Sequence, residues 1–436
     1  MLIVFIEYLS LCKSFIDLPM TLLFLCVGIF LSLILAVPQF RYFSKFFHIL
    51  QQKNLHESQK NSLSPIQALL TAMSTSLGMG SIAAPPVAIA IGGPGALFWL
   101  WVYAFFGGVI KFAEVTVAVH FKTKTKDGVI IGGPATYLQT ISPWLGYWYG
   151  LVTIFLFCAW SGLQTRTLAE IYAKVGISHS LTGLVMALFI FYMLLGGAQR
   201  IADFASALVP TMCTLYLVAS SVILLANFQA FIVAVQSIFI HAFTPTAALG
   251  GFAGSTVFMA AREGIFKGVF VTEAGMGTSS IPHAMAQTDS PKNQGILAMY
   301  SILVDTFFCT LSGLVALVTG VWKSGVISNA LIFDAFSLSF PNIGPVVLLI
   351  SITLFVLTTA LGNSFNGSKS FSTFTNGKYI TWYYLFACIM IFLGAITKTS
   401  TLWNGIEGVL VPLIAIPNLL GITYLIIKYK KELKLN

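Results

Sequence analysis

Residues 68–93 read Ala68-Leu-Leu-Thr-Ala-Met-Ser-Thr-Ser-Leu-Gly-Met-Gly-Ser-Ile-Ala-Ala-Pro-Pro-Val-Ala-Ile-Ala-Ile-Gly-Gly93, an apolar stretch that is long enough to cross a membrane but is interrupted in its middle. Gly78 and Gly80 stand where helix hydrogen bonds should continue, and Pro85 and Pro86 follow within the same stretch. Glycine destabilises a helix, and proline removes a backbone donor. Because lipid cannot satisfy freed backbone groups, a broken span persists only where protein or a polar cavity surrounds it.

The composition places the whole chain in a membrane. Of its 436 residues, 57% are hydrophobic and only 8% are charged, and the mean hydropathy is +0.89. Since a soluble domain has about 25% charged residues, these values exclude a soluble fold and indicate a multi-pass membrane protein in contact with lipid. The net charge of +9 lies mostly in short loops, where basic residues set orientation, so it does not indicate nucleic-acid binding. The six cysteines are scattered singly, which implies neither disulfides nor a metal site.

Apolar runs of about 20 residues predict eleven transmembrane helices and an all-α integral membrane fold. The seventh is long and is interrupted by the glycine-rich stretch 250–254. The expected segments are 18–37, 66–91, 95–120, 143–165, 180–198, 203–226, 231–265, 296–322, 342–364, 380–396 and 405–427.

The distribution of basic residues predicts the orientation of the chain. With the loop 38–63 in the cytoplasm, fifteen Lys and Arg residues fall inside and five fall outside, and the reversed topology inverts this ratio. We therefore expect a cell inner (plasma) membrane protein with its N-terminus outside and a basic tail, 428–436, in the cytoplasm. Residues 1–65 then hold a surface segment, one extra transmembrane helix and a cytoplasmic loop.

The positions of the two interrupted segments indicate an inverted repeat. When the first segment is set aside, ten core segments remain, and the interrupted ones are core segments one and six. They open two halves of five, 66–226 and 227–427. Five is odd, so the halves must cross the membrane in opposite directions, and paired broken helices mark the binding site of many secondary transporters.

A series of short motifs resembles the alanine/glycine:cation symporter family, which comprises sodium-coupled carriers of small amino acids. The motifs occur in order between residues 78 and 418, and their order and spacing carry more information than any one alone. They are Gly78-Met-Gly-Ser-Ile82, Gly92-Gly-Pro-Gly-Ala-Leu-Phe-Trp99, Lys111 with Glu114, Gly132-Gly-Pro134, Gly196-Gly197 with Arg200-Ile201, Leu208-Val-Pro210, Lys267-Gly268, Glu273-Ala-Gly-Met-Gly277, Asp305-Thr306, Thr359 with Gly362, and Ile416-Pro-Asn418. The resemblance implies the leucine-transporter-type five-plus-five fold with one extra N-terminal helix, sodium as the coupling ion and no other cofactor.

The chain departs from the family pattern at several positions near the expected pocket. Met79 and Ser81 replace a threonine and an asparagine of the first core segment, and Arg166 replaces an asparagine that follows Gln164. Asn363 replaces a tryptophan, and Asn366 replaces a tyrosine, in the eighth core segment. The departures leave the identity of the solute open, and Met79 either shrinks the pocket or swings away to admit larger solutes.

The two interruptions predict how an amino-acid zwitterion is held. The amides at Met79 and Gly80 can bind the carboxylate at the start of the second half-helix, and carbonyls released around Gly251, Phe252 and Ala253 can bind the ammonium. The alternative is that the glycines only permit close helix packing. The full expected solute site is Gly78, Met79, Gly80, Ser81, Gln164, Gly251, Phe252, Ala253 and Asn363.

A sodium site needs several hard oxygen ligands, which neutral hydroxyls and carbonyls supply. Thr358 and Thr359 offer adjacent hydroxyls, and Ser74 and Leu77 offer carbonyls just before the first break. By analogy with the fold that the resemblance implies, these four residues form the cation site. The alternative is that each threonine hydroxyl bonds back to its own helix.

Ionisable residues within apolar segments are candidates for function or for mutual neutralisation. Lys111 and Glu114 lie one helical turn apart, so we expect them to neutralise each other. Asp305 has no local partner. Its carboxylate either takes part in coupling or accepts hydrogen bonds from backbone amides as a structural group. We expect Glu273 at the cytoplasmic face, where it helps close an inner gate.

Arg166, which stands near the expected pocket, has two interpretations. Either it pairs with Glu170 at the outer mouth, one turn along the helix, or it contacts an anionic solute directly.

The sequence predicts a secondary active symporter that imports a small neutral amino acid of the alanine/glycine class with sodium by alternating access. The same fold with another small solute or with proton coupling is the main alternative. A membrane enzyme is disfavoured, because the sequence contains no HExxH, GxSxG or nucleotide-binding loop. A channel is disfavoured because paired broken helices, and not repeated pore loops, are present.

Overall fold

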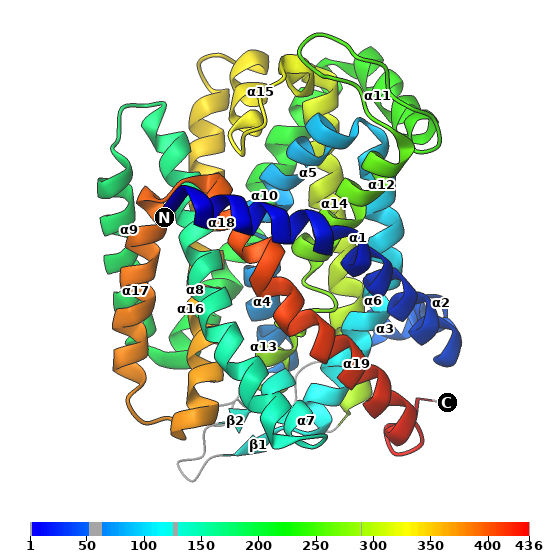
Figure 1. Cartoon of the computed structure of the whole chain (residues 1–436), viewed down its shortest axis with the longest axis vertical. Coiled ribbons are helices and arrows are strands. Elements are labelled where there is room, and N and C mark those ends of the chain that lie inside the picture. Colours follow the sequence, from blue (N-terminus) through cyan, green and yellow to red (C-terminus); the bar gives the residue numbers. More distant parts are fainter. Residues whose placement is uncertain (1, 52–62, 125–129, 289, 436) are drawn as a thin grey trace.

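The computed structural model describes residues 2–51, 63–124, 130–288 and 290–435, which are almost entirely helical (Figure 1). In these residues, eight helical stretches are long and apolar enough to cross a membrane. They are Phe15–Ile34, Pro65–Gly92, Gly95–His120, Pro143–Ala173, Gly197–Ala226, Pro291–Thr319, Gly344–Thr375 and Thr399–Tyr429. Three shorter apolar helices accompany them: His179–Leu194, Phe228–His241 and Ile380–Ile396.

The elements follow one another along the chain as a series of helices with one small ribbon. The first half comprises α1 (Leu2–Ile34), α2 (Pro38–Arg41), α3 (Phe43–Gln51), α4 (Pro65–Ser76), α5 (Met79–Gly92), α6 (Gly95–His120), β1 (Thr123–Lys124), β2 (Ile130–Ile131), α7 (Pro134–Gln139), α8 (Pro143–Ala173), α9 (His179–Leu194) and α10 (Gly197–Ala226). The second half comprises α11 (Phe228–His241), α12 (Val257–Thr272), α13 (Ser280–Ala284), α14 (Pro291–Thr319), η1 (Val321–Ser324), α15 (Leu331–Ser339), α16 (Gly344–Thr375), α17 (Ile380–Ile396), α18 (Thr399–Gly405), the π-helical turn η2 (Ile406–Leu410) and α19 (Val411–Tyr429). Strands β1 and β2 pair antiparallel.

Helix α1 contains Pro19 and runs obliquely across the bundle (Figure 1). It contacts α6, α12, α18 and α19. The interior of the bundle is built from the pairs α8 with α16, α6 with α12, and α6 with α14, which enclose α4 and α5. The interrupted stretch formed by α4 and α5 therefore lies deep inside the protein.

The break in the first core segment lies at Leu77 and Gly78, between α4 and α5. A side-chain carbon at Gly78 would lie 2.5 Å from Thr359 Oγ1, so glycine is required there by the close approach of α16. Pro85 lies inside α5 and does not end it. It leaves the Ser81 carbonyl without its helical donor, and Ser312 Oγ of α14 donates to that oxygen at 3.2 Å.

The second break is not where the sequence predicted it. Residues 250–254 were expected to interrupt one long segment, 231–265, but they lie in a loop between α11 and α12. Isolated bridges pair Thr246 with Ser255 and Leu249 with Phe252, so the glycines serve a turn. The interruption instead spans residues 273–279, between α12 and α13. There, Glu273, Gly275 and Gly277 have φ values of 56°, 89° and 79°, a left-handed backbone that glycine adopts without strain.

Candidate functional site

A small cavity lies where the two breaks meet. The end of α4, the start of α5, the end of α12 and the facing sides of α8 and α16 enclose it. It is lined by Thr75, Ser76, Gly80, Trp160, Gln164, Phe270, Glu273 and Asn363. Of the expected solute-site residues, the structure thus brings Gly80, Gln164 and Asn363 together around one space.

Aromatic rings wall this cavity. The rings of Trp160 and Phe270 meet edge to face with centroids 5.8 Å apart, and the Phe270 ring lies 4.7 Å from that of Trp403. A side-chain carbon at Gly80 would lie 3.2 Å from the Phe270 ring, which is tighter than ordinary packing. Glycine at position 80 therefore keeps the space beside the helix start open.

A second small cavity adjoins the first across Gly80, Gln164 and Phe270. It is lined by Met79, Gly80, Ala83, Ala84, Leu163, Gln164, Thr167, Phe270, Asn329 and Trp403. Met79 lines only this second cavity, whereas Asn363 and Glu273 line only the first. Met79 is buried, with 3% of its surface exposed.

Two polar atoms in the first cavity have no hydrogen-bond partner among the described residues. They are the indole nitrogen Nε1 of Trp160, a donor, and the amide oxygen Oδ1 of Asn363, an acceptor. The Gly80 amide adds a donor, because the first-turn amides of a helix have no intrahelical acceptor. Buried polar groups are nearly always satisfied, so unpartnered groups of both kinds around one cavity indicate a site for a polar ligand.

Gln164 links α8 to the first break. Its Oε1 accepts a hydrogen bond from the Met79 amide at 3.0 Å, so this amide, which was expected to face the solute, is already bound. The Ser81 hydroxyl donates to the Ser76 carbonyl at 3.1 Å, across the break. Met79 and Ser81 thus hold the broken backbone in place.

Two of the four expected cation ligands are in direct contact. Thr359 Oγ1 donates to the Leu77 carbonyl oxygen at 3.3 Å, which joins α16 to the first break. The Thr358 hydroxyl turns back to the Leu354 and Phe355 carbonyls, both at 3.0 Å. The Ser74 hydroxyl donates to the Thr71 carbonyl at 2.7 Å, which leaves the Ser74 backbone carbonyl as its candidate ligand.

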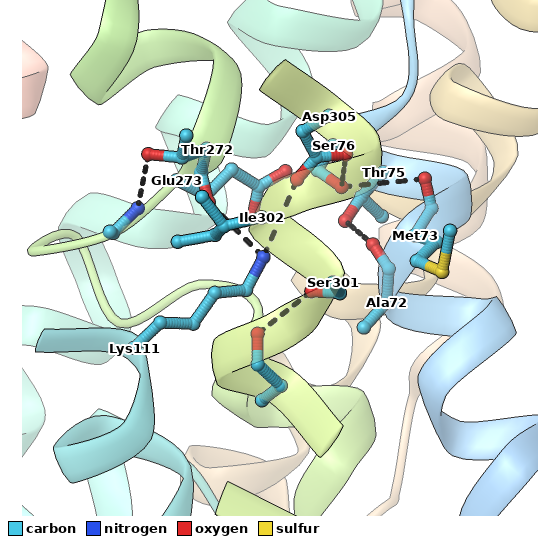
Figure 2. Close-up of polar contacts among 12 residues, drawn as sticks. Ala72, Met73, Thr75, Ser76, Lys111, Thr272, Glu273, Ser301, Ile302 and Asp305 are labelled. Carbon is cyan, nitrogen blue, oxygen red and sulfur yellow. Dashed lines mark hydrogen bonds and ion pairs between the residues drawn. The ribbon is translucent and has the colours of Figure 1, made fainter. Parts of the chain in front are cut away.

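The charge pairing within the bundle differs from the prediction. Lys111 was expected to neutralise Glu114, and Asp305 to have no local partner, but the Lys111 Nζ lies 3.8 Å from Asp305 Oδ2 and both side chains are fully buried (Figure 2). Lys111 also donates to the Thr272 carbonyl at 3.2 Å, and Asp305 Oδ1 accepts from Ser76 Oγ at 3.0 Å. The spacing that predicted the pair of Lys111 with Glu114 considers only partners on the same helix. The carboxylate that pairs with Lys111 belongs to Asp305 on α14.

Two glutamates occupy positions that the sequence did not indicate. Glu114 Oε1 accepts from Asn418 Nδ2 of α19 at 2.6 Å. Glu273 was expected at the cytoplasmic face, but it is 3% exposed and lines the first cavity. Its Oε2 accepts from Thr278 Oγ1 at 2.6 Å, across the second break.

Four other expected residues lie away from the first cavity. The Gly251 amide bonds to the Lys323 carbonyl at 2.6 Å, and Phe252 packs on Trp322 with ring centroids 5.1 Å apart. Ala253 belongs to the same loop, so the ammonium ligands that were expected there lie outside this site. Arg166 pairs with Glu170 at 3.1 Å and donates to the Ala395 carbonyl at 3.1 Å, as the first interpretation expected.

Several lining residues were not predicted from the sequence: Thr75, Ser76, Trp160, Phe270 and Trp403. A signal was present for Trp160, which precedes Gln164 by four residues and therefore shares its helix face. Phe270 lies three residues before Glu273. It could be predicted as a site residue only if the second break were known to lie at 273–279.

Comparisons with known proteins show the family of this chain. Residues 5–435 match the sodium:alanine symporter family. The chain belongs to this family. It is 33% identical over 438 residues to the sodium/alanine symporter AgcS of Methanococcus maripaludis, with 97% of this chain and 95% of that protein covered. It is 29% identical over 407 residues to the probable sodium/glutamine symporter GlnT of Bacillus subtilis, with 92% and 84% covered.

A solved structure shares the all-helical membrane fold of this chain. The crystal structure of MhsT in complex with L-phenylalanine matches with a TM-score of 0.60 at 12% identity, covering 83% of this chain and 89% of that one. MhsT has the leucine-transporter-type fold that the sequence resemblance implied. Membership of a family of sodium-coupled amino-acid symporters makes this chain a multi-pass membrane transporter and not an enzyme.

Proposed function

We propose that this protein imports a small neutral amino acid together with sodium, by alternating access, across the cell inner membrane. The observation that carries the proposal is the cavity between the two helix breaks, which holds unpartnered donors and acceptors. In secondary transporters, discontinuous helices form the site at the middle of the membrane. The sodium/alanine symporter that is 33% identical supports the solute class and the coupling ion.

The proposed architecture has eleven crossings. They are α1, α4 with α5, α6, α8, α9, α10, α12 with α13, α14, α16, α17, and α18 through α19. After α1, the two halves, 66–226 and 227–427, form a five-plus-five inverted repeat that places the broken helices in corresponding positions. Helix α11 is then a connection and not a crossing.

The proposed orientation follows from the basic residues. The loop 38–63 and the tail 428–436 lie in the cytoplasm, and the N-terminal segment begins outside. Residues 1–65, which contain the extra helix α1, precede the first repeat.

The donors and acceptors of the first cavity support a proposal for where the two ends of the solute bind. The Gly80 amide and Trp160 Nε1 bind the carboxylate, aided by the positive end of the α5 dipole. Asn363 Oδ1 and the Glu273 carboxylate bind the ammonium. The aromatic wall formed by Trp160 and Phe270 limits the side chain to the size of glycine or alanine.

A larger solute is the second candidate, and one observation favours it. The second cavity continues past Gly80 and Phe270 toward Met79 and Asn329. A side chain such as that of glutamine would enter this space if the Phe270 ring rotated. The relative named as a probable sodium/glutamine symporter is 29% identical over most of the chain.

The proposed sodium site joins α16 to the first break. The Leu77 carbonyl and the Thr359 hydroxyl, already 3.3 Å apart, supply two hard oxygens, and the Ser74 carbonyl and the Thr358 hydroxyl supply two more. The last carbonyls of α4 carry the negative end of its dipole, which adds to the attraction for a cation. Sodium bound there stabilises the contact between the break and α16, so ion and solute binding support each other.

Uptake into proteoliposomes tests the proposal. Labelled glycine, alanine and glutamine should be compared under an inward sodium gradient, with choline replacing sodium, and under an inward proton gradient alone. We expect sodium-dependent accumulation of one of the smaller solutes, and Phe252→Leu, outside both cavities, should behave like the parent protein. Equal uptake in sodium and choline removes the sodium assignment, and the absence of uptake of all three amino acids removes the solute class.

A further inference from the structure

Lys111 lies where the ends of two broken helices meet. Its side chain is fully buried on α6, and its Nζ donates to the carbonyl of Thr272, the last residue of α12, at 3.2 Å. The same Nζ lies 3.8 Å from Asp305 Oδ2 on α14. Asp305 Oδ1 in turn accepts from Ser76, the last residue of α4, at 3.0 Å. One ammonium group is therefore connected to both breaks (Figure 2).

The ammonium faces helix ends and acidic side chains. A helix ends with a partial negative charge, and here α12 ends at the ammonium while α4 ends at the carboxylate that faces it. Lys111 also interacts electrostatically with the buried side chains of Glu114 and Glu273. Without Lys111, the described part of this junction would hold the Asp305 carboxylate and the carbonyl-bearing ends of α12 and α4 without the ammonium that now faces them.

Such a set of groups is what binds a cation in secondary transporters. Unwound carbonyls and the C-terminal ends of half-helices coordinate the coupling ion there, and sodium favours hard oxygen ligands of the kind that Asp305, Thr272 and Ser76 present. The Lys111 ammonium already supplies a positive charge at this position and makes the contacts that an ion would make. A buried lysine is costly unless it is paired, so its presence among these oxygens indicates a specific role.

We propose that Lys111 is a tethered cation that takes the place of a second coupling ion. The transporter then moves one sodium ion per solute, at the site between Leu77 and Thr359, while Lys111 permanently supplies the charge at the junction of Ser76, Thr272 and Asp305. This inference rests on the proposed sodium symport and adds its stoichiometry. Removal of the ammonium should convert the junction into a second sodium site.

The test measures sodium and solute together. Wild-type protein and Lys111→Met are reconstituted in proteoliposomes, and the initial uptake of radioactive sodium and of labelled alanine or glycine is followed in the same vesicles. We expect a ratio of one sodium per solute for the wild type and two for Lys111→Met. The double variant Lys111→Met with Asp305→Asn lacks the carboxylate and should return to a ratio of one. Lys111→Arg keeps the charge and should also stay at one.

The outcomes separate this inference from the proposed function. If the wild type shows no sodium-stimulated uptake, the proposed symport fails first. If the wild type cotransports two sodium ions, or if Lys111→Met transports with the ratio unchanged at one, the tethered cation is wrong while symport stands.

If Lys111→Met is purified but transports too weakly, its thermal stability is measured across sodium concentrations, with choline holding the ionic strength constant. Stabilisation that rises more steeply with sodium than in the wild type supports the second site. An unchanged slope contradicts it. If Lys111→Met does not fold, the same sodium titration is made with Lys111→Gln, where a steeper slope than in the wild type supports the second site and an unchanged slope contradicts it.

Discussion

Thr359 Oγ1 on α16 lies 3.3 Å from the carbonyl oxygen of Leu77, and the two atoms join the bundle to the broken backbone between α4 and α5. A side-chain carbon at Gly78 would lie 2.5 Å from the same hydroxyl, so the approach depends on glycine at that position. The first break and α16 are thus in direct polar contact, which a cation between the two oxygens would strengthen.

We expect Thr359→Ala to weaken the sodium dependence of transport without unfolding the protein. Loss of one hard oxygen should raise the sodium concentration for half-maximal uptake by about tenfold, which corresponds to about 1.4 kcal/mol. Thr373→Ala is the matched control, because the Thr373 hydroxyl donates to the Ser370 carbonyl of its own helix. Normal sodium stimulation of a well-folded Thr359→Ala protein would contradict the site.

Gly80→Leu should abolish solute binding, since even a first side-chain carbon at this position would lie 3.2 Å from the Phe270 ring. Gly80→Ala adds that one carbon and should reduce affinity less. Direct binding of labelled alanine or glycine to purified protein measures both variants. Unchanged affinity in Gly80→Leu would show that the solute lies elsewhere.

Asn363→Leu should lower solute affinity by about tenfold to a hundredfold. Its Oδ1 is the unpartnered acceptor in the cavity, and a hydrogen bond to a charged group contributes about 1.5–3 kcal/mol. Asn366→Leu is a suitable control, because Asn366 is also buried on α16 but does not line either cavity. Equal losses in the two variants would point to a general effect on α16 and not to a solute contact.

Asp305→Ala should destabilise the protein by about 3–5 kcal/mol, because it leaves the buried ammonium of Lys111 without its carboxylate partner. The double variant Lys111→Met with Asp305→Ala should be more stable than Asp305→Ala alone, since neither charge remains. Thermal unfolding of the detergent-purified proteins checks the order. If both variants melted at the same temperature, the pair would have no energetic coupling.

The sequence predicted the first break well because its signal is local. Gly78 and Gly80 stand within an uncharged apolar run, and no second glycine-rich stretch lies within the predicted segment 66–91 to be mistaken for the break. The prolines were less informative than expected. Pro85 is tolerated inside α5 because Ser312, which is 227 positions further along the chain, satisfies the carbonyl that the proline leaves free.

The second break was misplaced because two glycine-rich stretches lie close together in the sequence. Residues 250–254 contain more glycine than 273–277. In addition, Arg262, Glu263 and Lys267 give α12 more charged residues than is usual for a helix in a membrane. The structure shows that Lys267 is neutralised by Glu407 at 2.7 Å, a partner 140 residues away. The Lys111–Asp305 pair was missed for the same reason, since helical spacing cannot reveal partners on distant helices.

The most direct test of the central claim is an experimental density map of the protein, recorded in the presence of sodium and of an amino acid whose binding has first been confirmed with labelled solute. We predict interrupted density at residues 77–78 and 273–279, with the solute between them, in contact with Gly80 and Asn363. A continuous helix through either interruption, or a solute bound outside this space, would contradict the mechanism.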